Sequence, residues 1–161
     1  MLDYDYSSTG KIEEAKILFK KELKPKILDK GINKIEVQKT DFKINFNKKD
    51  KNLINLEGNY KTNDSKFKNF KFTNNLDPVN TEFTVDFDLS ENIFIDLINF
   101  KTNKEKLGSI SSRFILDKNG LNIESFNFSE ENNLIEVKNL KLDKKNQIYQ
   151  LKNIKINTFN D

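Results

Sequence analysis

The residues best suited to chemistry are two carboxylates, Asp86 and Asp88, which lie two positions apart in an alternating segment. Side chains two apart along a β-strand share a face, so this pair could bind a cation or serve as a catalytic acid and base. Phe83, Val85 and Phe87 alternate with the two carboxylates, which is the ordinary pattern of a strand with one wet face. We therefore favour a solvated strand face over a catalytic or metal-binding pair.

Other catalytic chemistry has little support in the sequence. The chain has no cysteine and no histidine, which excludes a disulfide framework, a thiol nucleophile and a zinc site built from those residues. It also lacks a glycine-rich phosphate loop and a nucleophile-elbow motif. We predict that the protein is not an enzyme and that it uses no metal and no cofactor.

Aromatic residues interleaved with lysines, as in Phe67-Lys-Asn-Phe-Lys-Phe72, suggest at first a surface for single-stranded nucleic acid. In a strand, however, the two residue types point to opposite faces, so stacking on bases and contact with phosphates could not easily cooperate. Only one of the 28 basic residues is an arginine, Arg113, and the lysines are mixed with 25 acidic residues. This mixture produces no strong field of one sign, and we expect no nucleic-acid partner.

The composition limits the architecture that must position these residues. A chain of 161 residues is long enough for one domain with its own core. Hydrophobic residues make up 35 % of it and charged residues 33 %, a balance that fits a thin architecture in which each strand buries one face. The 14 phenylalanines argue against disorder.

One hydrophobic spacing recurs along most of the chain, Φ-x-Φ-x-x-Φ-x-Φ, in which Φ is apolar. Full copies begin at positions 93, 121, 135 and 149, so the starts differ by 28, 14 and 14 residues, and partial copies begin at 65 and 37. A 14-residue unit corresponds to one strand of about ten residues and a short turn. We predict an all-β fold, an elongated and curved antiparallel meander that forms a groove or a half-barrel.

The apolar positions of these copies are the candidate residues of a core or of a lipid-binding groove. They are Phe67, Phe70, Phe72, Ile93, Ile95, Ile98, Phe100, Leu121, Ile123, Phe126, Phe128, Ile135, Val137, Leu140, Leu142, Leu151, Ile154 and Ile156.

The two adjacent x positions in the middle of the spacing, here called the x-x step, would turn the apolar face over unless a bulge takes up one residue. We therefore predict a bulge or bend near the middle of most strands, with examples near Glu124-Ser125 and Lys138-Asn139. A tight turn is predicted at Asn119-Gly120, because both residue types tolerate positive φ. Repeated bulges would curve the sheet.

Residues 10–24 fit two structures. An amphipathic helix ended by Pro25 would carry a stripe made of Ile12, Ala15, Phe19 and Leu23. A strand would instead use the alternation of Ala15, Ile17 and Phe19. We favour the strand and keep one short N-terminal helix as the alternative. We treat 1–161 as one repeat-built β domain, with residues 1–31 as a lead-in.

The ends of the chain bear on its context. No apolar run approaches the roughly 18 residues of a membrane span. The first residues, Met1 to Tyr6, do not resemble a signal peptide. Residues 154–161 still follow the strand pattern, so we expect this chain to be a segment of a longer protein.

Two stretches carry a resemblance to a known family. The first, Phe114-x-Leu-Asp-Lys-Asn-Gly-Leu-x-Ile-x-x-Phe-x-Phe128, is followed by Ile135-x-Val-x-x-Leu-x-Leu142. Together they resemble the repeating units of the AsmA-like superfamily, the TamB- and YhdP-type bridge proteins of Gram-negative bacteria. Gly10-Lys-Ile-Glu-Glu-Ala-Lys-Ile-x-Phe19 and Leu56-Glu-Gly-Asn-Tyr60 are similar in character.

The resemblance implies a function in phospholipid transport and outer-membrane biogenesis. It implies an inner-membrane-anchored protein whose hydrophobic groove crosses the periplasm, with phospholipid acyl chains and flanking repeats of the same polypeptide as partners. It supplies no catalytic residue. Two alternatives stay open: a β-jellyroll of the lipopolysaccharide-transport type, and a structural or adhesive β-solenoid with a filled core. The residues do not decide between an open groove and a closed core.

Overall fold

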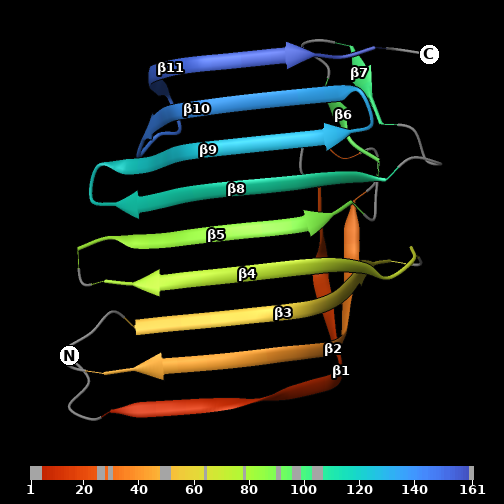
Figure 1. Ribbon diagram of the computed structural model, residues 1–161, viewed down its shortest axis with the longest axis vertical. Helices are drawn as coiled ribbons and strands as arrows, with labels where there is room; N and C mark the ends of the chain where they lie inside the picture. Colours follow the sequence, from red (N-terminus) through yellow and green to blue (C-terminus); the bar gives the residue numbers. More distant parts are fainter. Residues whose placement is uncertain are drawn as a thin grey trace.

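The computed structural model describes residues 5–24, 28, 31–47, 52–63, 65–77, 79–89, 92–95, 99–102 and 107–159. Its regular elements are strands, which confirms the predicted all-β antiparallel meander (Figure 1). The main sheet has nine strands in the order β1-β2-β3-β4-β5-β8-β9-β10-β11, and it is not closed into a barrel. The strands of this sheet are β1 (Tyr6–Leu23), β2 (Ile32–Phe46), β3 (Asn52–Thr62), β4 (Lys68–Leu76), β5 (Thr81–Asp88), β8 (Gly108–Asp117), β9 (Gly120–Glu130), β10 (Asn133–Asp143) and β11 (Ile148–Asn157).

The N-terminal segment is a strand, which confirms the favoured interpretation and makes the helix alternative wrong. Residues 6–23 form β1, which pairs with β2 along most of its length. Ala15 lies opposite Val37 and Ile17 opposite Ile35. The alternating apolar residues of β1 therefore lie opposite apolar residues of β2. A helix at this position would not make these cross-strand pairs.

One face of the sheet is apolar from strand to strand. Leu56 of β3 lies opposite Phe72 of β4, and Phe72 lies opposite Val85 of β5. The row continues through the ring of Phe83, which stacks on Phe114 of β8 with centroids 5.0 Å apart. Antiparallel neighbours therefore share the same apolar side across the sheet.

Bulges occur where the x-x step predicts them in the C-terminal strands. Arg113 of β8 lies opposite Ser125 of β9, whereas Phe114 lies opposite Ile123, so Glu124 is the additional residue. In β10, Asn139 has a φ of 52° at the corresponding step. The pairings of β10 with β9 and with β11 keep one register across this step. The bulge predicted near Glu124 is therefore confirmed, whereas the step at Lys138-Asn139 is marked by the positive φ of Asn139 and not by a register shift.

The prediction of a bulge in most strands is wrong for the centre of the sheet. The pairings β3–β4, β4–β5 and β5–β8 show no register shift, because the apolar residues of β4 and β5 keep a period of two, interrupted only by the polar Asn74 in the apolar row of β4. Phe67 was the residue that suggested an x-x step before Phe70. It precedes β4, so that step lies outside the strand.

The predicted turn at Asn119-Gly120 joins β8 to β9, with Asp117 paired to Gly120. Gly120 has a φ of 144°, and a Cβ there would lie 2.2 Å from the carbonyl oxygen of Leu142. Only glycine fits this position without a shift of the backbone.

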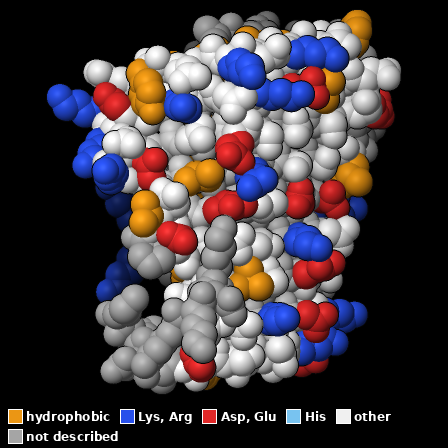
Figure 2. Space-filling view, turned by 60° about the vertical axis from the view of Figure 1, so that its left-hand side comes forward, with side chains coloured by type: hydrophobic (Ala, Val, Ile, Leu, Met, Phe, Trp, Pro, Cys, Tyr) orange, Lys and Arg blue, Asp and Glu red, His pale blue; other side chains and the backbone are white. Residues whose placement is uncertain are grey.

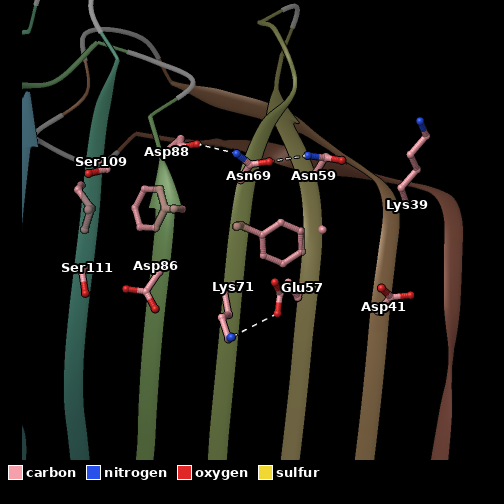
Figure 3. Close-up of a pocket in the computed structure, with 14 residues that line it drawn as sticks. Lys39, Asp41, Glu57, Asn59, Asn69, Lys71, Asp86, Asp88, Ser109 and Ser111 are labelled. Atoms are coloured by element: carbon pink, nitrogen blue, oxygen red, sulfur yellow. Dashed lines mark hydrogen bonds and ion pairs between the residues drawn. The ribbon is translucent and has the colours of Figure 1, made fainter.

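The sheet turns a corner where β2 crosses β3. Gln38 lies opposite Asn59 and Asp41 opposite Glu57, so Lys39 and Thr40 together face the single residue Gly58. Lys39 has a φ of 48°, the left-handed conformation of a bulge. Beyond this corner the β1–β2 hairpin runs across the other strands, and it passes behind them when the polar face is viewed (Figures 1 and 3).

A short hairpin covers one end of the apolar face. It consists of β6 (Phe94–Ile95) and β7 (Phe100–Lys101), which pair with each other and not with the main sheet. The expectation that the spacing from 93 to 100 marks a strand of the meander is therefore wrong. Ile93 and Phe100 instead pack on the sheet, and Leu28 at the tip of the β1–β2 hairpin forms a bridge with Ile93.

The buried core is small and lies beneath this cover. Its members, each at most 6 % exposed, are Ile93, Phe100, Ile110, Phe128 and Ile135. The hydroxyl of Thr102 accepts a hydrogen bond from the Ile93 N–H at 2.8 Å, so this backbone N–H of the covering segment also has a partner. Most of the apolar face lies outside this core and is only partly buried.

Candidate functional site: an apolar groove inside the corner

A groove of about 440 Å³ lies on the apolar face, inside the corner that the β1–β2 hairpin makes with the sheet. Its lining combines the bent part of β2 with β3, β4 and β5. The lining residues are Ile35, Val37, Leu56, Tyr60, Phe70, Lys71, Phe72, Val85, Asp86 and Phe87. Most of these side chains are aliphatic or aromatic, and the volume lies within the range of about 300–1,000 Å³ usual for small-molecule sites.

The bulge at Lys39 is what places the hairpin over the groove. Ile35 and Val37 precede the bulge, and Phe42 and Ile44 follow it. Without the additional residue, the apolar side chains on the two sides of the step would point to opposite faces. The bulge therefore keeps one apolar face through the corner, so that the side chains of Ile35 and Val37 line the same cavity as Val85.

Tyr60 forms the inner end of the groove. Its ring meets those of Phe70 and Phe87 edge-on, with centroid distances of 5.9 Å and 6.2 Å. Its hydroxyl donates a hydrogen bond of 2.7 Å to the backbone oxygen of Asp88. The ring is thus fixed between apolar neighbours while its polar atom is satisfied at the strand end.

Charged residues hold the corner on the opposite side of β2. The carboxylate of Glu36 forms ion pairs with Lys61, at 2.9 Å, and with Lys34, at 3.0 Å. The side chain of Glu36 is 13 % exposed. The hydrogen bond from Lys61, followed by that from Lys34, lowers the pKa of Glu36 below the ordinary value. Lys61 Nζ also lies 4.8 Å above the ring of Phe67.

The polar face carries a second hollow, of about 520 Å³, into which Asp86 and Asp88 project (Figure 3). The Asp88 carboxylate accepts a hydrogen bond of 3.0 Å from the amide of Asn69, whose oxygen accepts one from Asn59. Lys71 is paired with Glu57 at 3.3 Å.

This hollow has the character of a solvated strand face. Within the described ranges, no three carboxylates or other ligand side chains come together to hold a metal ion. Carboxylates, amides and lysines alternate across the strands, as the alternation predicts. Figure 2 shows the same mixture of positive and negative side chains over the side of the molecule drawn there.

The structure distributes most of the predicted groove residues over four places. Phe70 and Phe72 line the groove. Ile93, Phe100, Phe128 and Ile135 are core residues, with Ile95 and Phe126 packed against them. Leu151, Ile154 and Ile156 are half-exposed on the edge strand β11. Paired strands β9 and β10 carry Leu121, Ile123, Val137, Leu140 and Leu142.

Two predicted residues stand apart from these sets. Phe67 precedes β4 and lies under Lys61, not in the groove lining. Ile98 lies outside the described residues.

Sequence reasoning missed most of the hairpin side of the groove. Ile35, Val37 and Tyr60 were not singled out as groove residues, although each belongs to an alternating strand pattern. A signal existed in the break near Lys39-Thr40, where the apolar alternation changes phase. That phase change marks the corner, but it does not reveal what the bent hairpin covers.

Comparisons of this chain with known proteins found no similar protein. No protein-family model matches the chain, and neither does any curated protein or solved structure. The fold and the groove define the class directly: an open antiparallel β-meander with one apolar face, folded over itself at one corner. Across the described ranges, there is no helix with the length and apolar character needed to cross a membrane.

Proposed function

We propose that the chain binds acyl chains of lipids in the apolar groove, as a non-enzymatic segment of an AsmA-like lipid-transport protein. The observation that carries this proposal is the groove of about 440 Å³ at the inside of the corner, lined by residues such as Val37, Leu56 and Val85. A small core and an unfilled apolar groove favour this function over a structural solenoid with a filled interior. The location proposed with it is the periplasm, and the ligand class is phospholipid.

The energetics favour long chains. Each buried methylene contributes about 0.8 kcal/mol, so burial of ten methylenes contributes about 8 kcal/mol. Association costs about 4–15 kcal/mol in lost freedom. A short acyl chain therefore offsets less of this cost, and we expect palmitate to bind much more tightly than octanoate.

The first test is the lipid content of the protein itself. Native mass spectrometry after expression in lipid-containing cells should detect co-purified phospholipid. A titration with a fluorescent palmitate analogue should show saturable binding that unlabelled palmitate displaces and octanoate does not. Absence of both signals would contradict the proposal.

A matched pair of variants locates the binding site. Val85→Asp places a charge among the apolar residues of the groove, whereas Thr84→Asp places the same charge one residue away on the polar face, opposite Arg113. We expect Val85→Asp to weaken palmitate binding at least about 10-fold, a loss of about 1.4 kcal/mol, and Thr84→Asp to change it less than about 2-fold.

A second groove variant guards against loss of folding. Val37→Trp fills the groove from the hairpin side without adding charge, and it should weaken binding while the urea midpoint stays near that of the wild type. Equal binding by the wild type, Val85→Asp and Val37→Trp would show that the groove is not the lipid site.

A further inference from the structure

The polar side chain of Asn74 lies in the apolar rows beside the groove. Asn74 follows Phe72 by two residues on β4, so the two side chains point to the same, apolar face of the sheet. Its cross-strand neighbours are Ile54 of β3 and Phe83 of β5. Phe72 lines the groove, so Asn74 occupies the next position along β4, at the end of the groove away from the corner.

The amide oxygen of Asn74 is buried and accepts no hydrogen bond from the part of the chain that the structure describes. A buried amide without a partner costs stability, and most buried polar atoms of folded proteins are paired. The amide oxygen of Asn122 is in the same state, but it belongs to the opposite face of the sheet, where Asn122 pairs with Lys141. Only Asn74, of these two residues, adjoins the groove.

Another polar residue of the apolar face shows how such a group is usually satisfied. Ser112 lies opposite Val85, and its hydroxyl donates a hydrogen bond of 3.0 Å to the backbone oxygen of Ser125. An apolar side chain in place of Asn74 would continue the row of Ile54 and avoid the cost of an unpaired amide. The asparagine breaks a local rule without a gain in stability, which is typical of a functional position.

At the inner end of the groove the polar atom is already paired. The Tyr60 hydroxyl donates its hydrogen bond to the backbone oxygen of Asp88, so this end suits the methyl end of a chain. From Phe70 to Asn74, four residues of a strand without a bulge span about 13 Å. An acyl chain in one leaflet of a bilayer spans about 15 Å, half of a hydrocarbon core of about 30 Å. One extended chain therefore fits between the two ends.

We propose that the groove prefers acyl lipids whose polar end donates a hydrogen bond, and that the side-chain oxygen of Asn74 accepts this bond. The unpaired atom is an acceptor, so the matching ligand group is a hydroxyl or an amide N–H, whereas an ester or ether oxygen cannot pair with it. The χ2 torsion of asparagine is broad, so the oxygen can turn from its neighbours toward the ligand. The inference rests on the proposed lipid binding and narrows the class of lipid.

Two ligands with the same chain separate a donor from an acceptor. Hexadecanol carries a hydroxyl, whereas hexadecyl methyl ether has an oxygen that accepts but cannot donate. Each is titrated as a competitor of the fluorescent palmitate analogue, and the measured quantity is the ratio of the two affinities. The wild type should bind the alcohol more tightly than the ether.

A matched pair of variants assigns this preference to one residue. Asn74→Leu removes the acceptor and should lower the ratio at least about 5-fold, the effect of one net hydrogen bond. Asn75→Leu makes the same change one residue away on the polar face, opposite Glu82, and should change the ratio less than about 2-fold. Asn74→Leu should also raise the urea midpoint, because it removes an unpaired buried amide, so the lost preference would not result from unfolding.

The orientation of the chain has its own test. A hexadecanol analogue with a nitroxide at its methyl end should broaden the backbone amide NMR signals of Tyr60 and Phe70 more than those of Asn74 and Phe83. The reverse pattern would overturn the proposal, because the hydroxyl would then lie at the inner end of the groove.

The remaining results separate this inference from the proposed function. An unchanged ratio in Asn74→Leu would overturn the inference, while saturable binding of palmitate would leave the proposed function standing. A lower urea midpoint of Asn74→Leu would also overturn the inference, since the amide would then have a stabilising partner within the chain. Absence of binding by the palmitate analogue and by both competitors would contradict the inference and the proposed function together.

Discussion

At the residue scale, the corner of the sheet depends on the absence of a side chain. A Cβ on Gly58 would lie 2.3 Å from the hydroxyl oxygen of Thr40 and 2.6 Å from its Cα, and Thr40 itself is 1 % exposed. The second contact is with backbone, which cannot move aside as a side chain can. Glycine is therefore required where two residues of β2 face one residue of β3.

We predict that Gly58→Ala destabilises the fold by about 1–3 kcal/mol, the usual cost of overpacking a filled site. Gly10→Ala is the matched control, because its Cβ would approach the end of the Phe42 ring, 2.8 Å away, which can rotate. Urea unfolding should show a clearly larger loss for Gly58→Ala. Equal losses would mean that the close approach at the corner is not specific.

The ion pairs of Glu36 make the stability of the corner depend on pH. Its pKa is lower in the folded chain than in the unfolded chain, where it is about 4.3. The stabilisation is therefore complete above the unfolded value and is lost as the pH falls through the lower, folded value. We expect Glu36→Gln to lower the urea midpoint at pH 7, and this difference from the wild type to shrink as the pH falls below about 4.3. A difference that stays constant with pH would contradict this assignment.

At the element scale, the x-x step specified strand bending only where it fell inside a strand. In β9 the step carries Glu124, the additional residue of a bulge, and in β10 it carries Asn139, which has a φ of 52°. In β4 the same spacing includes Phe67, which lies before the strand begins, and the strand alternates without a bulge. The pattern in the sequence thus predicts the apolar residues well, but the strand boundaries decide which steps become bulges.

The positions of two elements, the short β6–β7 hairpin and the bent β1–β2 hairpin, could not be predicted from the hydrophobic periodicity. Ile93 and Phe100 fit the repeat as well as Ile135 does, yet they form a cover over the sheet and not a strand within it. The bent hairpin that carries Ile35 likewise reaches across the sheet. Both positions depend on contacts between distant parts of the chain, which a local hydrophobic pattern does not encode.

At the scale of the whole molecule, the meander and its single apolar face were predictable because nearest neighbours along the chain pair in the sheet. Whether that face would be open or closed was left undecided by the sequence. The structure has an open sheet whose groove exists only because the β1–β2 hairpin folds back over the apolar face. The candidate site is therefore a product of tertiary folding, and among its lining residues only Phe70 and Phe72 were predicted as groove residues.

The bridge between Leu28 and Ile93 also has a consequence for the order of folding. Neighbouring strands close short loops and can form early, whereas this bridge joins segments far apart in the chain and must wait for the sheet. Contacts that form after the transition state change the unfolding rate more than the folding rate. The cover should therefore be the last part to assemble and the first to open.

Stopped-flow chevron plots can check this order. Ile93→Ala removes a side chain that is 3 % exposed, which should cost about 2–5 kcal/mol. We expect unfolding to become at least about 10-fold faster while refolding changes less than about 3-fold, because the bridge is absent from the transition state. Phe72→Leu, in the central meander, should instead slow refolding. If Ile93→Ala slowed refolding as well, the cover would be part of the folding nucleus. A late-forming cover would let the small core beneath it open locally while the sheet stays folded.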